Sequence, residues 1–213
     1  MNPTRLPARD GVPHHATRHH GETINAMTTI LDAADTANTA ADTAAQMSGR
    51  WTAAANITAH LVRSAVACHG IHSAGTELDE HTRDALTELA TAFAEMSDLV
   101  MPALVAMPPL TLRNGTGYDE IPLQGREHAD TAIEAATTAQ RARAAAALRI
   151  LADSDTIPEA VRTRLGWAAV NINPGPDEHL NSAVWGRGNG LAGKLRAVTD
   201  LLQALHTRYE AAA

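Results

Sequence analysis

Side chains capable of metal or thiol chemistry concentrate in one stretch of the chain, residues 50–69. This stretch contains the only cysteine, Cys68, two histidines, His60 and His69, and one of the three tryptophans. Successive residues of a helix point about 100° apart, so His69 is poorly placed to activate the Cys68 thiol. We therefore expect a buried bundle helix in which Cys68 is a small core residue. Small or apolar residues recur at the spacing of one helix face, at Ala54, Ile57, Leu61, Ala65 and Cys68.

A glycine-rich stretch near the end of the chain leads to its only lysine. Gly188, Gly193 and Lys194 match GxxxxGK, the spacing of a phosphate-binding loop. That loop needs a serine or threonine after the lysine to hold magnesium, and a buried strand before the first glycine. Leu195 follows the lysine here, and only the short segment SAVWGR precedes the first glycine. We expect no nucleotide at this loop, whose glycines allow a helix to begin beside Trp185.

Two short motifs contain histidines in a pattern that a known family uses for metal binding. A Trp-Thr pair at Trp51 is followed on the same predicted helix by a His-Leu pair at His60, and a later segment reads EHAD around His128. The pattern resembles the metal-binding helices of DinB-like bundles, including mycothiol-dependent isomerases. The resemblance implies a divalent metal such as zinc held by His60 and His128. It is confined to these motifs: the Trp-to-His spacing is one residue longer than in the family, and Gln124 stands where the family has Glu or His.

No further catalytic motif accompanies these histidines. The chain has no Glu-x-x-His pair of the ferritin-like di-iron type and no GxSxG nucleophile motif. Partly exposed histidines on bundle helices are the alternative interpretation, and it requires no catalytic residue and no cofactor. Residues 1–21 contain three prolines, no periodicity and four more histidines, so we expect a disordered tail there, followed by a single helical domain over residues 22–213. The four tail histidines are His14, His15, His19 and His20.

The composition favours helices and disfavours several classes of partner. Aromatic residues are 3% of the chain, and the abundant alanine requires helix axes that approach closely, which favours an all-α fold over a sheet. The net charge of -7 and the dispersed arginines disfavour nucleic-acid binding. The longest apolar run, residues 99–110, is too short to span a membrane and contains three prolines. With one cysteine and no readable signal peptide, we expect a cytoplasmic protein, and the Ala, Thr and Arg usage suggests a bacterial source.

The hydrophobic spacing predicts a bundle of five to six principal helices with a small β-hairpin insert. Leu89 and Phe93 mark the most continuous apolar face, and Ser48-Gly49 is expected to turn the chain into an antiparallel helix hairpin that Trp51 covers. Asn114-Gly115 between short apolar runs predicts the β-hairpin. A short helical turn is also expected at residues 177–184. The main helices are expected over residues 22–47, 50–69, 76–100, 124–153, 155–171 and 191–209.

The first predicted helix contains an exact repeat. The segment AADTA occurs at residues 33–37 and again at 40–44, seven residues apart, which is typical of a helix that pairs with a neighbour. The predicted stripe on this helix is Ile24, Met27, Leu31, Ala34, Ala41 and Ala45, interrupted by Asn38. Part of it, near Met27 and Leu31, extends beyond the shorter second helix and is a candidate interface. Packing of residues 191–209 against it is the competing expectation.

These observations favour a non-enzymatic helical interaction or scaffold protein. Its partner is expected to be another protein or a second copy of the chain, with no nucleic acid and no membrane involved. The alternative is a metal-dependent enzyme of the DinB-like kind that uses His60 and His128.

Overall fold

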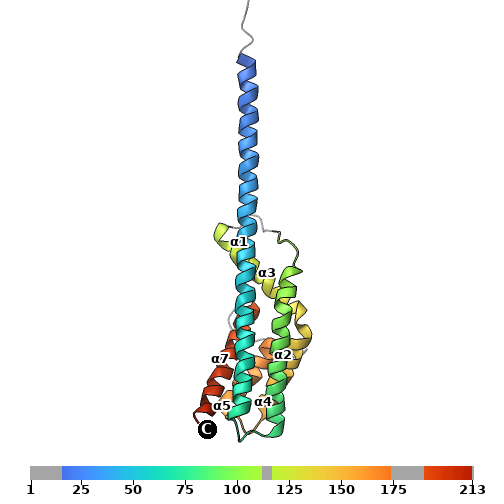
Figure 1. Cartoon of the computed structure of the whole chain (residues 1–213), viewed down its shortest axis with the longest axis vertical. Helices are drawn as coiled ribbons and strands as arrows, with labels where there is room; N and C mark the ends of the chain where they lie inside the picture. The colour runs from blue at the N-terminus through green and yellow to red at the C-terminus, as the bar shows by residue number, and fades with distance from the viewer. Residues whose placement is uncertain (1–15, 112–116, 174–189, 213) are drawn as a thin grey trace, which may run out of the picture. The chain divides into compact units, whose positions relative to one another are not determined.

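The computed structural model describes residues 16–111, 117–173 and 190–212, with side chains described at Thr29 and from residue 31 onward. Every regular element in these ranges is helical, which confirms the all-α fold class. The elements are α1 (Ala16–Ala74), α2 (Glu80–Val105), η1 (Tyr118–Glu120), α3 (Ile121–Ala136), α4 (Thr138–Asp153), α5 (Glu159–Ile172) and α7 (Gly190–Glu210), labelled in Figure 1.

Contacts divide the chain into two compact units, residues 1–44 and residues 45–213. Unit 1 contains the first part of α1, which begins at Ala16, so the last residues of the predicted tail are helical. Unit 2 contains the rest of α1 and the other helices, and it holds the hydrophobic core. The predicted Asn114-Gly115 turn, the predicted helix at residues 177–184 and residues 1–15 lie outside the described residues.

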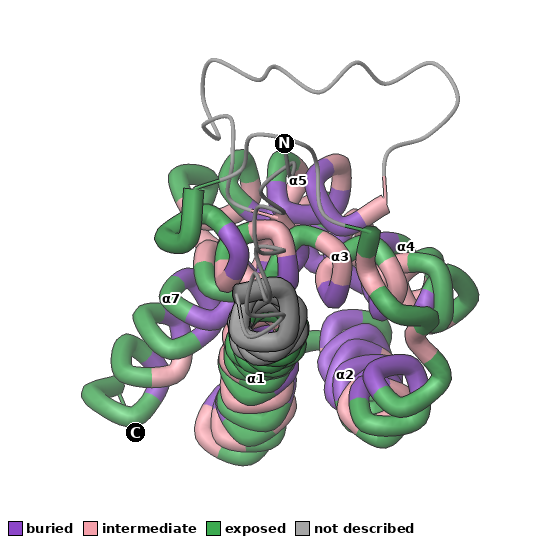
Figure 2. Tube along the Cα trace, turned by 90° about the horizontal axis from the view of Figure 1, so that it is seen from above, coloured by how far each residue is buried: buried purple, intermediate pink, exposed green. Residues whose placement is uncertain are grey.

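The core of unit 2 is built from leucine and alanine on facing helices. In this unit α2 packs on α4, α4 on α5 and α5 on α7, while α3 contacts α2 and α7. Figure 2 shows that buried positions lie on the sides of these helices that face one another. Alanine supplies many of these positions, which requires closely spaced helix axes. The buried alanines include Ala53, Ala54, Ala90, Ala92, Ala144, Ala145, Ala147, Ala168 and Ala169.

The predicted apolar face of α2 is confirmed, since Leu86, Leu89, Phe93, Met96 and Val100 are fully buried. The α7 helix also buries one face. The α2 helix begins later than predicted because Asp79 caps it: its carboxylate accepts the backbone N–H of Thr82 at 2.7 Å. The buried stripe of α7 is Leu191, Leu195, Val198, Leu202, Leu205 and Tyr209.

The predicted turn at Ser48-Gly49 is wrong, because α1 continues through it from Ala16 to Ala74. Gly49 is needed for packing: a Cβ there would overlap the backbone carbonyl of Pro122 in α3. Gly125 has the matching role on α3, where a Cβ would overlap the carbonyl of Gln46. The two glycines let the backbones of α1 and α3 touch. Trp51 lies within this continuous helix and is 50% exposed.

Other predicted boundaries also differ from the structure. Pro102 does not end α2, which continues to Val105; the proline is exposed in the last turns, where water can reach the carbonyl left without a donor. The predicted helix 124–153 is two helices separated at Thr137, whose φ of -105° and ψ of 16° depart from helical values. Residues 118–121, which follow the predicted Asn114-Gly115 turn, are helical: Tyr118–Glu120 form η1 and Ile121 begins α3. Pro122 stands in the first turn of α3, a position that favours proline.

We predict that Phe93→Ala lowers the unfolding free energy by about 3–5 kcal/mol, the usual range for a buried phenylalanine. Phe93 is fully buried on α2 and belongs to the core of unit 2. Urea unfolding followed by circular dichroism measures the change. Thr91→Ala on the exposed side of the same helix is the control, with an expected change within about 0.5 kcal/mol. A loss below about 1 kcal/mol for Phe93→Ala would contradict the core assignment.

Candidate functional site

His60 lies half-buried on α1 beside α7. The Thr199 hydroxyl of α7 donates to the backbone carbonyl of His60 at 3.2 Å and lies 2.9 Å from the Ser64 hydroxyl. Burial lowers the pKa of the His60 imidazole, and the positive charge of Arg63 acts in the same direction. Its Nδ1 is buried without a hydrogen-bond partner. A neutral imidazole with an unpaired nitrogen has the chemical character of a metal ligand.

His128 lies half-buried on α3, and its Nε2 also has no hydrogen-bond partner. A catalytic zinc site uses three protein ligands and one open position. Within residues 16–111, 117–173 and 190–212, no three His, Cys, Asp or Glu side chains gather at metal-binding distances. The described side chains therefore do not assemble a three-ligand zinc site around either histidine. For His60 and His128, the zinc-enzyme alternative stays an untested prediction.

Cys68 is a core residue of α1, as predicted. Its side chain is 1% exposed, and burial strongly raises the pKa of its thiol. The thiol therefore stays protonated, whereas a nucleophilic cysteine must form the thiolate.

The GxxxxGK segment leads into α7, whose first residues are held by α3. Asp130 of α3 accepts the backbone N–H of Leu191, and a Cβ on Gly190 would overlap the Asp130 carboxylate. Gly190 also has a φ of 45°, a left-handed conformation that favours glycine. Lys194 Nζ donates to Glu134 Oε1 at 2.7 Å, so its charge is paired within unit 2. Gly188 lies outside the described residues.

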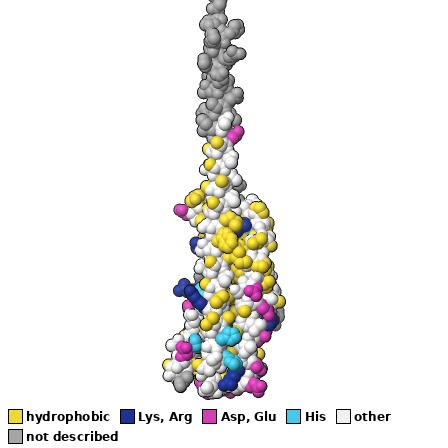
Figure 3. All heavy atoms as spheres, in the orientation of Figure 1, with side chains coloured by type: hydrophobic (Ala, Val, Ile, Leu, Met, Phe, Trp, Pro, Cys, Tyr) yellow, Lys and Arg dark blue, Asp and Glu magenta, His cyan; other side chains and the backbone are white. Residues whose placement is uncertain are grey.

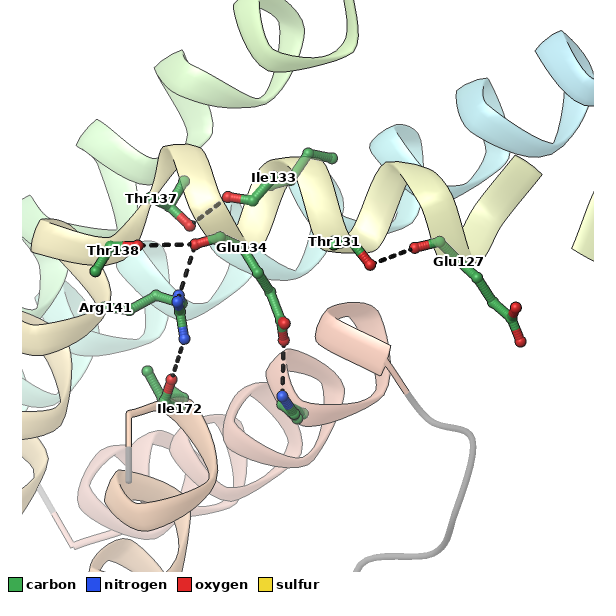
Figure 4. A network of polar contacts seen from close by, with 9 residues as sticks. Glu127, Thr131, Ile133, Glu134, Thr137, Thr138, Arg141 and Ile172 are labelled. Atoms are coloured by element: carbon green, nitrogen blue, oxygen red, sulfur yellow. Dashed lines mark hydrogen bonds and ion pairs between the residues drawn. The ribbon is translucent and has the colours of Figure 1, made fainter. Parts of the chain in front are cut away.

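Arginines of α4 connect the helices of unit 2. Arg141 donates to the backbone carbonyls of Ile172 in α5 and Glu134 in α3, each at 2.9 Å (Figure 4). Arg143 pairs with two carboxylates of α2, Glu88 at 2.6 Å and Glu95 one heptad further on. Arg149 donates to the carbonyl of Asn173 at 3.2 Å, which places a second arginine at the end of α5. These three arginines of α4 therefore connect α4 to the ends of α3 and α5 and to two carboxylates of α2.

Unit 2 has an exposed apolar surface on α1 that sequence analysis missed. Met47, Trp51, Val62 and Val66 are 38%, 50%, 49% and 61% exposed. Figure 3 shows hydrophobic side chains gathered over α1 and the adjacent α2, where Met101 and Val105 are also exposed. Contiguous exposed apolar surface marks interaction sites in soluble proteins. We call Met47, Trp51, Val62 and Val66 the α1 apolar surface. The sequence did contain a sign of this surface: the four residues are separated by four, eleven and four positions, a spacing that places them on one face of a helix.

In unit 1 the helix surface is exposed as well. Every residue from 31 to 41 is exposed, and Leu31 of the predicted interface is 60% exposed. The threonine hydroxyls on this segment bond their own helix, as Thr36 does to the carbonyl of Asp32 at 2.8 Å and Thr43 to that of Thr39 at 2.8 Å. The side chain of Met27 lies outside the described ones.

No protein-family model, curated protein or solved structure was found to match this chain. Among the helices in the described ranges, none combines the length and the apolar character needed to cross a membrane. The exposed faces of α1 are the candidate interaction site.

Asp130 gives a prediction on pH. Burial, reinforced by the negative charge of Glu134, raises the pKa of the Asp130 carboxyl to about 6. An unfolded aspartate releases its proton near pH ~4, so between about pH 4 and about pH 6 the folded state binds more protons and its stability falls as the pH rises. Asp130→Asn should make the unfolding free energy fall less over this window in urea unfolding. An exposed substitution with the same charge change, Asp84→Asn on α2, is the matched control, and an unchanged pH dependence in Asp130→Asn would contradict the assignment.

Proposed function

We propose that this chain is a non-enzymatic helical interaction protein that associates with itself through α1. The observation that carries the proposal is the complete exposure of residues 31–41 of α1 in unit 1. An isolated helix is marginal in water, and most helices in proteins are stabilised by packing of an apolar face. This segment has such a face but covers it with nothing in its own unit. A partner helix would supply the missing contact.

The repeat in α1 provides the kind of surface that another helix can pack against. The two AADTA units contribute six exposed alanines, which return to one side of the helix at intervals of three and four residues. Alanine lets two helix backbones approach to the short end of the usual 8–10 Å range. The threonines bond their own helix, as Thr39 does to the carbonyl of Asp35 at 2.9 Å, so they require no polar partner. The six alanines are Ala33, Ala34, Ala37, Ala40, Ala41 and Ala44.

The two aspartates of the repeat, and Thr39 between its two units, lie away from this alanine face. With about 100° between successive helix residues, Asp35, Thr39 and Asp42 point to the side opposite the alanines. The helix is therefore amphipathic with very small apolar residues, a pattern that favours close pairing of two helices over burial in a core of leucines.

Self-association is tested by sedimentation equilibrium of the full chain across about a hundredfold range of concentration. We expect a monomer at the low end and a larger species at the high end. Ala37→Glu puts a charge on the alanine face and should weaken association about tenfold or more, about 1.4 kcal/mol or more. Thr39→Glu adds the same charge on the opposite side of the same helix and is the matched control.

A single monomeric species at every concentration would contradict the proposal. Equal weakening by Ala37→Glu and Thr39→Glu would show that net charge, and not the alanine face, controls association.

A further inference from the structure

We draw no further inference here: the strongest candidate, the α1 apolar surface of unit 2 with the exposed Met101 and Val105 of α2 beside it, is an unpartnered apolar face, and nothing in the described part of the chain shows what covers it.

Discussion

A helix that presents an apolar face needs that face covered, and this constraint governs α1 along its whole length. Between residues 45 and 74 one side of α1 completes the core of unit 2, with Ile57, Leu61 and Ile71 fully buried. Between residues 31 and 41 no side chain is buried. The same helix therefore satisfies the constraint in one unit and leaves it unsatisfied in the other. Under the proposed self-association, a second copy would cover the exposed face of residues 31–41.

The interior of unit 2 depends on how closely its helices approach. At Gly49 and Gly125 the absence of a side chain lets α1 and α3 touch backbone to backbone. Burial of apolar surface stabilises a fold by ~25 cal/mol per Å², and small residues bury little of it. Polar contacts between helices therefore contribute a larger share of the stability of this core. Arg141 binds carbonyl groups at the ends of two helices, and Lys194 pairs with Glu134 across α3 and α7. These contacts fix the order of helices around an alanine-rich core.

Much of the fold follows from local spacing, and the rest depends on contacts between distant residues. Leu86, Leu89 and Phe93 are large and regularly spaced, so their burial was predictable from α2 alone. Gly49 has the same local signature as a turn, and only the approach of Pro122 explains why the helix continues. The function of Arg141 likewise depends on the carbonyl of Ile172, which is remote in sequence. The exact AADTA repeat indicated helix pairing, whereas the exposure of Trp51 was missed because a turn was expected beside it.

Amide hydrogen exchange of residues 31–41 as a function of protein concentration tests the central claim most directly. An uncovered helix opens readily, so its amides exchange fast, whereas a helix packed in a dimer is protected. We expect fast exchange in dilute solution and slow exchange at high concentration, with the core amides near Phe93 slow throughout. Equal exchange of residues 31–41 at every concentration would contradict the claim that α1 pairs with a second copy.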